Sequence, residues 1–217
     1  MKMTKFASIR EALIACDAEK LTEAVNTAVS DGAGANAILN DGLIAAMDVI
    51  GERMETGEMF IPEVLMAAQL MGGAVETLRP HLAEGSHNSA GKVLLGTVKG
   101  DVHDIGKNLV FMMLESAGFE VKDVGVDVPA DTFVSEIKSF QPDIVALSAL
   151  LTTTIPMMKT TIDALTTAGV RDSVKVIVGG APVSQSFADK IGADGYGADA
   201  GSASRLARKL VGEIRAN

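Results

Sequence analysis

The chain has 217 residues and a mass of 22.5 kDa, with 47% apolar residues and a formal net charge of −9. This length suffices for one large domain or two modest ones. The acidic balance disfavours nucleic acids and anionic membranes as partners, because phosphate groups repel it. No apolar run approaches the ~18 residues that a membrane span needs, and the single cysteine, Cys16, cannot form an internal disulfide. We therefore expect a cytoplasmic protein.

Residues 1–84 have the pattern of a helical domain. Apolar residues recur at helical spacing, and runs of β-branched residues are few. The expected breaks between helices are 30–32, 40–42, Gly57 and Pro62. Helix starts are expected at Asp41 and at Ile61, which precedes a proline. The pattern predicts a four-helix bundle.

Residues 85–91 are small and polar and predict a linker. From residue 92 onward, short apolar runs alternate with amphipathic segments of helix length, the pattern of βαβ units. The expected strands are 92–98, 120–124, 144–148, 174–178 and 195–198. The expected helices are 105–117, 131–139, 155–168, 184–191 and 202–215. Residues 92–217 are therefore predicted to form a doubly wound, five-stranded parallel sheet of flavodoxin or Rossmann type, so the chain is an α/β protein.

The loop expected after the first strand contains one histidine flanked by acidic residues. Ligands of such sheets bind at the carboxyl ends of the strands, where this loop lies. An imidazole that binds a metal through one ring nitrogen is commonly oriented through the other, and Asp101, two residues before His103, is placed to accept that N–H. Gly106 would let the chain turn tightly into the next helix and leave room for a bulky ligand.

Three other interpretations of this loop stay open at this point. A phosphate-binding loop needs four residues between its glycines and Ser or Thr after the lysine, whereas five residues separate Gly100 from Gly106 and Asn108 follows the lysine. A hydrolytic metal site needs more nitrogen or sulfur ligands, and the other histidines, His81 and His87, lie in or beside the linker. A single loop histidine can also be merely exposed to solvent.

Three short motifs stand at the ends of expected strands. They are Asp-x-His-x-x-Gly (Asp101, His103, Gly106), Ser-x-Leu (Ser148, Leu150) and Gly-Gly (Gly179, Gly180). In this order and spacing they resemble the signature of the B12-binding family. The segment Gly57 to Leu65, GEMFIPEVL, is similar to the helical cap of methionine synthase and of the corrinoid proteins of methylotrophic methyltransferase systems. The resemblance covers nearly the whole chain.

The resemblance implies cobalamin or a related corrinoid, as methylcobalamin and cob(I)alamin, bound with its own base detached from cobalt. His103 would be the lower axial ligand of the metal, Asp101 would fix its tautomer, and Thr154 would extend this relay with a hydroxyl where the family has serine. Met59 and Phe60 would cover the upper face of the corrin. The other implied cofactor-binding residues are Gly100, Val102, Asp104, Ile105 and Gly106 in the loop and Ser148, Leu150, Thr152, Gly179, Gly180 and Ala200 at later strand ends.

The implied function is that of a methyl carrier without turnover of its own, in one-carbon metabolism such as methanogenesis or acetogenesis. Its partners would be a substrate-specific methyltransferase, a second methyltransferase that uses coenzyme M or tetrahydrofolate, and a reductive activase. A B12-dependent transcriptional sensor is the alternative, but no helix-turn-helix motif is recognisable and the acidic charge disfavours DNA. The small subunit of an adenosylcobalamin mutase is disfavoured because the cap suits methyl rather than adenosyl ligands.

Overall fold

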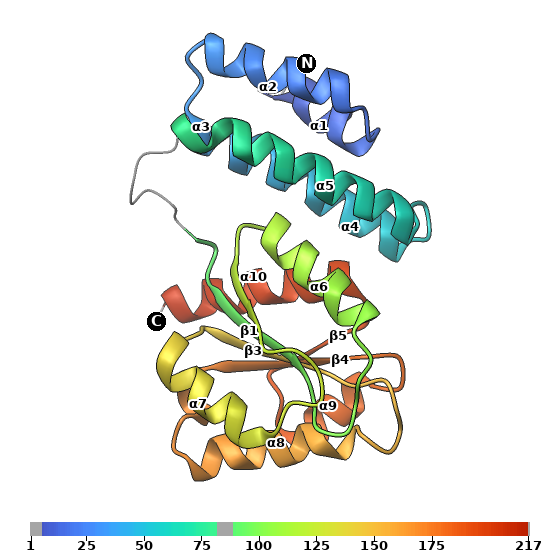
Figure 1. Cartoon of the computed structure of the whole chain (residues 1–217), viewed down its shortest axis with the longest axis vertical. Coiled ribbons are helices and arrows are strands. Elements are labelled where there is room, and N and C mark those ends of the chain that lie inside the picture. The colour runs from blue at the N-terminus through green and yellow to red at the C-terminus, as the bar shows by residue number, and fades with distance from the viewer. Residues whose placement is uncertain (1–5, 82–88, 217) are drawn as a thin grey trace. The chain divides into compact units, whose positions relative to one another are not determined.

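The computed structural model describes residues 6–81 and 89–216, which belong to two compact units, Met1–Asn88 and Ser89–Asn217 (Figure 1). Most of the predicted linker, 85–91, lies outside the described residues. Within the described part of the chain, every helix is too short or too polar to cross a lipid bilayer. The sheet unit has the elements that the sequence pattern predicts, whereas the helical unit departs from the predicted helix boundaries.

The first unit consists of helices. They are α1 (Ala7–Ile14), α2 (Ala18–Ser30), a continuous helix made of α3 (Ala35–Ala37), the π-helical η1 (Ile38–Ile44) and α4 (Ala45–Glu55), and α5 (Ile61–Leu78) followed by the 3-10 turn η2 (Arg79–His81). Large apolar side chains from α1, α2, η1, α4 and α5 are buried. The predicted four-helix arrangement is confirmed, although two of its boundaries differ from the prediction.

The chain break predicted at 40–42 is wrong, and so is the helix start at Asp41. Gly42 lies inside the π-helical stretch and is buried. A Cβ atom at this position would lie 3.3 Å from Cγ2 of Ile9 in α1. The glycine is therefore explained by the close approach of two helices, and the helix continues through it.

A break that the sequence pattern did not indicate separates α1 from α2. Cys16 adopts a φ of 53°, a left-handed conformation that is uncommon outside glycine. Asp17 then caps α2, since its carboxylate accepts a hydrogen bond of 3.1 Å from the amide of Lys20. Because the turn uses neither glycine nor proline, its one mark in the sequence is Asp17, a residue type that often caps helices.

The second unit is a parallel sheet with the strand order β2-β1-β3-β4-β5. Its strands are β1 (Lys92–Thr97), β2 (Glu120–Asp123), β3 (Ile144–Ser148), β4 (Lys175–Gly179) and β5 (Gly195–Gly197). Its helices are α6 (Ile105–Ser116), α7 (Ala130–Phe140), α8 (Pro156–Thr167), the short η3 (Arg171–Ser173), α9 (Gln185–Ile191) and α10 (Ala200–Ala216). The strands and helices predicted for this region are all confirmed, with ends displaced by at most two residues.

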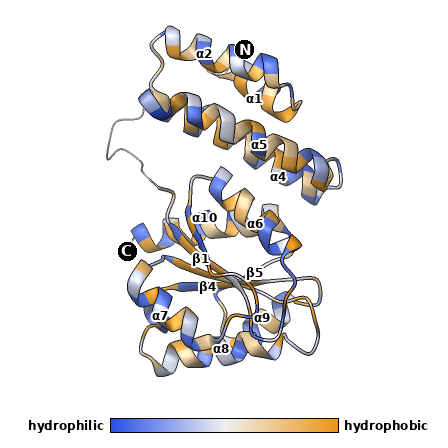
Figure 2. Cartoon of the chain, in the orientation of Figure 1, coloured by the Kyte–Doolittle hydropathy of each residue, from blue (hydrophilic) through white to orange (hydrophobic). Residues whose placement is uncertain are grey.

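Helices cover both faces of this sheet. α6 and α10 lie on one face, and α7, α8 and α9 lie on the other (Figure 1). Successive residues of β1 point to opposite faces, so Leu94 belongs to the core under α7 and α8, whereas Val93 and Leu95 belong to the core under α6 and α10. Accordingly, the strands are mainly hydrophobic in colour and the helices carry both colours (Figure 2). Burial on both faces is typical of parallel sheets.

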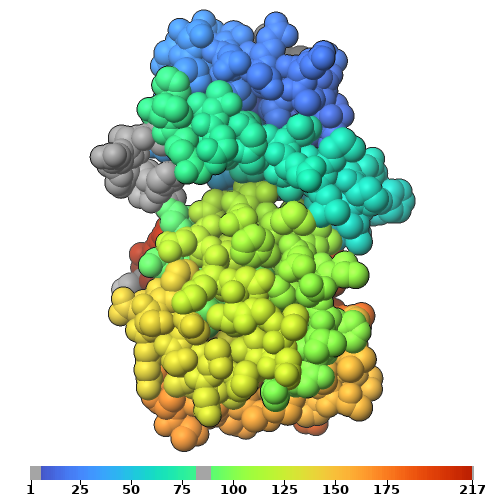
Figure 3. All heavy atoms as spheres, viewed as in Figure 1, coloured from blue at the N-terminus to red at the C-terminus, as the bar shows by residue number. Residues whose placement is uncertain are grey.

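The strand order places the loops after β1 and β3 side by side. Thr97 pairs with Ser148, and Ser148 pairs with Gly179, so the ends of three strands are in register. The winding direction of the sheet reverses between β1 and β3, and ligands of such sheets bind at this point. The residues between β1 and β3, coloured green to yellow in Figure 3, form most of the face of this unit that is visible there.

Candidate functional site

The loop between β1 and α6 carries His103 at the carboxyl edge of the sheet. Gly100 has a φ of 84°, a conformation that favours glycine, and α6 begins soon after, at Ile105. The hydroxyl of Thr97, the last residue of β1, donates a hydrogen bond of 3.0 Å to the carbonyl of His103. The histidine is thereby tied to the end of the strand.

Asp101 joins this loop to the loop after β3. Its side chain is fully buried, and one oxygen, Oδ1, lies 2.8 Å from Nδ1 of His103 and accepts a bond of 3.1 Å from the His103 amide. The other oxygen, Oδ2, accepts hydrogen bonds from the hydroxyl of Thr154 at 2.6 Å and from the amides of Leu150 at 2.8 Å and Leu151 at 3.2 Å. The structure thus brings together Asp101, His103 and Thr154, the three residues of the predicted relay.

These contacts determine the charge of Asp101. Burial by itself would raise the pKa of the carboxyl, but the hydrogen bonds from Thr154, Leu150 and His103 outweigh burial and hold this pKa well below its usual range. An ionised carboxylate can only accept hydrogen bonds, so Nδ1 of His103 carries a proton. In the neutral imidazole the lone pair then lies on Nε2, which hydrogen-bonds to none of the residues that the structure describes.

The segments that carry His103 and the partners of Asp101 also carry large exposed apolar side chains. The His103 side chain is 46% exposed, while the exposed fractions are 69% for Val102, 81% for Ile105, 42% for Leu150 and 41% for Leu151. Val102, Leu150 and Leu151 belong to the two loops that Asp101 joins, and Ile105 is the first residue of α6. Exposed apolar side chains gathered around one polar group are typical of a ligand-binding surface. In contrast, residues 6–81 and 89–216 contain no group of three or more His, Cys, Asp or Glu side chains suited to holding a metal ion.

Two family models, both described as B12 binding domains, match the chain, one over residues 91–204 and the other over residues 6–79. The chain belongs to the B12-binding family. It is 45% identical to dimethylamine corrinoid protein 1 of Methanosarcina acetivorans over 92% of its own length and 94% of that protein. These matches confirm the resemblance to the B12-binding family that the three motifs indicate.

Solved structures of B12 proteins have the same fold. A cobalamin-binding protein from Desulfitobacterium hafniense superposes with a TM-score of 0.85 and 33% identity, over 95% of this chain and 98% of that one. A chain of the methanol:cobalamin methyltransferase complex from Methanosarcina barkeri superposes with a TM-score of 0.81 and 28% identity, over 98% of this chain and 81% of that one. Both similarities extend over the helical unit as well as the sheet.

In this B12-binding chain the turn after β4 is shaped by glycines. Gly180 has a φ of 133°, and a Cβ atom on it would lie 1.8 Å from the carbonyl oxygen of Ala149. A Cβ atom on Gly179 would lie 3.0 Å from the carbonyl oxygen of Gly197. The backbone of the neighbouring strand ends therefore excludes any side chain at Gly180, with or without a ligand.

The other residues predicted to line the nucleotide tail differ in burial. Ser148 is half-buried at the end of β3, Thr152 is exposed in the following loop, and Ala200 is buried as the first residue of α10. Ser148 lies beside Gly179 in the sheet register. The contact of these residues with a nucleotide tail stays a prediction.

Gly106 is not a turn residue. It lies within the first turn of α6, has no positive φ, and has no atom within 4 Å of the place where a Cβ would stand. The tight turn expected at this glycine is therefore wrong, because the left-handed residue of the loop is Gly100. The space beside Gly106 is open, as a bulky ligand would require, and its use by a ligand stays a prediction.

The two predicted cap residues have different environments within the helical unit. The side chain of Met59 is 6% exposed and belongs to the core of that unit. Phe60, which directly precedes α5, is 67% exposed. Their role over a cofactor stays a prediction, and only Phe60 presents its ring to the surface of its own unit.

Sequence reasoning missed Leu151, Thr97 and Asp127. Leu151 donates its amide to Asp101, and Thr97 holds the carbonyl of His103. Asp127, in the loop after β2, accepts a hydrogen bond of 2.7 Å from the amide of Gly100. Two leucines shortly after the end of β3, where turn residues are usual, were the only signal for Leu151.

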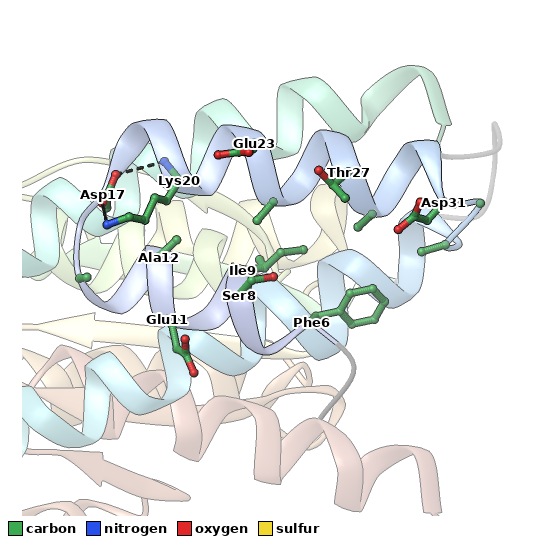
Figure 4. Close-up of a pocket in the computed structure, with 15 residues that line it drawn as sticks. Phe6, Ser8, Ile9, Glu11, Ala12, Asp17, Lys20, Glu23, Thr27 and Asp31 are labelled. Carbon is green, nitrogen blue, oxygen red and sulfur yellow. Dashed lines mark hydrogen bonds and ion pairs between the residues drawn. The ribbon is translucent and has the colours of Figure 1, made fainter. Parts of the chain in front are cut away.

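The helical unit contains a groove of about 870 Å³ between α1 and α2 (Figure 4). Ile9 and Ala12 lie at its apolar base, and charged residues stand along it, including the ion pair of Asp17 with Lys20 at 2.7 Å. None of the predicted site residues lines this groove. It is therefore a feature of the helical unit alone.

Proposed function

We propose that this chain binds a corrinoid and carries a methyl group on its cobalt between two methyltransferases, without turnover of its own. Its membership of the B12-binding family supports the cofactor. One relative is named a dimethylamine corrinoid protein, and one similar structure is part of a methanol:cobalamin methyltransferase complex. These relatives favour a methyl carrier over a B12-dependent sensor.

The observation that carries the proposal is the orientation of the His103 ring. Its Nδ1 is held by the buried, ionised Asp101, so the neutral ring offers the lone pair of Nε2, a donor that suits a cobalt ion. The exposed side chains of Val102, Ile105 and Leu150 suit the broad, largely apolar face of a corrin macrocycle. The residues therefore fit the group, and His103 would be the lower axial ligand, with the base of the cofactor detached.

The residues of the chain supply positioning. When bound, the corrinoid supplies a cobalt centre that accepts and releases a methyl group. Asp101 keeps a proton on Nδ1 of His103 and fixes the direction of the ring. The hydroxyl of Thr154 donates a hydrogen bond to Oδ2 of Asp101, which favours the ionised form of the carboxylate. The relay therefore presents one nitrogen lone pair in a fixed direction.

The first experiment measures ligation by His103. The wild-type chain, His103→Ala and the control His81→Ala are incubated with hydroxocobalamin, desalted and examined by absorption spectroscopy. We expect the wild type and His81→Ala to retain cobalamin with a histidine-ligated spectrum, because His81 lies in η2 of the helical unit. His103→Ala should lose that spectrum. A colourless wild type, or an unchanged spectrum of His103→Ala, would overturn the assignment.

The second experiment tests the partners. The proposed partners are a substrate-specific methyltransferase, which selects the methyl donor, a second methyltransferase acting on coenzyme M or tetrahydrofolate, and a reductive activase. We expect methyl transfer from donor to acceptor only when the holoprotein and both methyltransferases are present. Product formed by the holoprotein alone would contradict a carrier without turnover. Transfer that proceeds without the holoprotein would contradict its role as a carrier.

A further inference from the structure

A second carboxylate holds the loop that bears His103. Asp127 lies in the loop after β2, and its Oδ1 accepts a hydrogen bond of 2.7 Å from the amide of Gly100. Its Oδ2 accepts a hydrogen bond of 3.0 Å from Nζ of Lys99, and its own amide donates one of 2.8 Å to the carbonyl of Asp101. Asp127 thus contacts each of the three consecutive residues that lead into the segment with His103.

The backbone of Asp127 is adapted to this contact. Its φ is 55°, in the left-handed region that costs free energy for residues with a side chain, although Asp tolerates it better than most. The next residue, Val128, returns to the sheet by bridging with Val98 and donating its amide to the carbonyl of Thr97 at 3.0 Å. An unfavourable conformation between fixed neighbours is typical of a residue whose side chain has a specific task.

The contacts of Asp127 complete a chain of constraints on His103. Thr97 holds the histidine carbonyl, and Asp101 holds its amide and its ring. Asp101 is buried and fixed by the loop after β3, whereas Lys99 and Gly100 are exposed. Among the described residues, Asp127 provides the only side chain that hydrogen-bonds to Lys99 or to the amide of Gly100. Without the carboxylate of Asp127, Lys99 and Gly100 would keep no hydrogen bond to a described side chain, and their turn would be closed only by the bond of 3.1 Å from the amide of Asp101 to the carbonyl of Val98.

We propose that Asp127 is a positioning residue, which orders the loop from Lys99 to Asp101 so that His103 meets the corrinoid at the required place. The inference rests on the proposed function, because it assumes ligation by His103. A metal ligand must be held within about 0.5 Å of its working position, and residues behind the ligand commonly do this. Asp127 acts through the backbone and touches neither the histidine ring nor any reacting atom.

The test uses Asp127→Gly, which removes the carboxylate and tolerates the positive φ, and Asp127→Asn, which keeps an acceptor and also tolerates that φ. Asp194→Ala is the matched control. The carboxylate of Asp194 likewise bridges a backbone amide, that of Val176 at 2.7 Å, and a cation, Arg171 at 2.7 Å. Asp194 immediately precedes β5, and therefore lies at the opposite edge of the sheet from His103.

Two quantities are measured. In the cobalamin-free protein, amide hydrogen exchange of residues 99–103 should be about tenfold faster in Asp127→Gly, because a hydrogen bond to a charged group is lost. With hydroxocobalamin, the ratio of histidine-ligated to unligated cobalt should fall by a similar factor in Asp127→Gly. Asp127→Asn should stay near the wild type in both measurements. Asp194→Ala should lower the melting temperature and leave both quantities unchanged.

The outcomes separate the two proposals. If the wild type shows histidine ligation and Asp127→Gly shows the same ratio, Asp127 is not a positioning residue, while the carrier function stands. If the wild type binds cobalamin without histidine ligation, the assignment of His103 as ligand fails and the positioning role of Asp127 fails with it. Should Asp127→Gly not fold, Asp127→Ser replaces it, because its side chain is too short to reach both Lys99 and Gly100, and the same ratio decides.

Discussion

The loop after β1 and the turn after β4 lie at the same edge of the sheet but are built in opposite ways. The first depends on side chains, since Asp101, His103 and Thr154 hold one another by hydrogen bonds. The second depends on the absence of side chains, since the backbone of Ala149 occupies the space beside Gly180. Substitutions in the first should therefore change ligand geometry, whereas substitutions in the second should change the fold itself.

The largest loss of stability is expected for Gly180→Ala. The new Cβ would lie 1.8 Å from the carbonyl oxygen of Ala149, and φ is 133°, so both strand ends must move. We expect a loss of about 4 kcal/mol in the free energy of unfolding, or no folded protein. Urea denaturation of this variant and of Gly192→Ala provides the comparison. Gly192 has a φ of 77° with no atom within 4 Å of its Cβ position, so it should lose only about 1 kcal/mol. Equal losses would contradict steric exclusion at Gly180.

The second largest loss of stability is expected for Asp101→Asn, because Asp101 hydrogen-bonds to both His103 and Thr154. Each carboxylate oxygen of Asp101 accepts hydrogen bonds, Oδ1 from His103 and Oδ2 from Leu150 and Thr154. In asparagine one oxygen is replaced by an NH2 group, which faces donors and cannot accept their hydrogen bonds. We expect a loss of about 2 kcal/mol in the free energy of unfolding at neutral pH, and weaker cobalt ligation. Chemical denaturation measures the first effect, and the spectrum with hydroxocobalamin measures the second. Full retention of stability and ligation would show that the carboxylate is not needed.

The same pair of proteins should differ in pH dependence. The pKa of Asp101 is lowered by folding, so its carboxylate stabilises the native state above its unfolded pKa of about 3.9. That contribution is lost as the pH falls through the lower pKa of the folded state. The stability difference between wild type and Asp101→Asn should therefore be largest above about pH 4 and shrink in more acidic solution. A difference that grows on acidification would reverse the sign assigned to this group.

Thr154→Val should have a smaller effect than Asp101→Asn. The isosteric change removes the hydroxyl that donates to Oδ2 of Asp101 at 2.6 Å but leaves the amides of Leu150 and Leu151 in place. We expect a loss of about 1.5 kcal/mol and a rise in the pKa of Asp101. Thr154→Ser keeps the hydroxyl and serves as the control. Equal stability of the valine and serine variants in denaturation experiments would exclude a role for this hydrogen bond.

The fold of the sheet unit was more accessible to sequence reasoning than that of the helical unit. Buried parallel strands appear as short apolar runs, and all five were recognised. In the helical unit, Gly42 suggested a chain break because the sequence does not tell whether a glycine ends a helix or admits a neighbouring one. The real break uses Cys16, a residue that seldom adopts a positive φ, so propensity gave no warning.

Some residues of the site could also be predicted from the sequence and others could not. Asp101 and His103 were found because they stand in a motif with family resemblance, and Thr154 because the resemblance implies a hydroxyl that extends the relay. Their hydrogen bonds agree with the predicted relay. Thr97 and Asp127 were missed. Their contribution depends on which backbone groups they reach after folding, and Asp127 is 27 residues away from Gly100. The Asp127 contact arises from the strand order and the Thr97 contact from the course of the loop after β1, and neither leaves a periodic pattern in the sequence.

Gly106→Ala should have the smallest effect on stability and decides between two explanations of this glycine. No atom lies within 4 Å of the new Cβ, and alanine favours a helix, so the free energy of unfolding should change by less than about 0.5 kcal/mol or increase. If the open space instead accommodates the ligand, the same methyl group should weaken the retention of cobalamin after desalting. Gly212→Ala, in α10 and also without neighbours at its Cβ position, controls for helix propensity. Unchanged retention in both variants would show that Gly106 leaves room that the cofactor does not use, and would confine the requirement for glycine at this edge to Gly100 and the turn after β4.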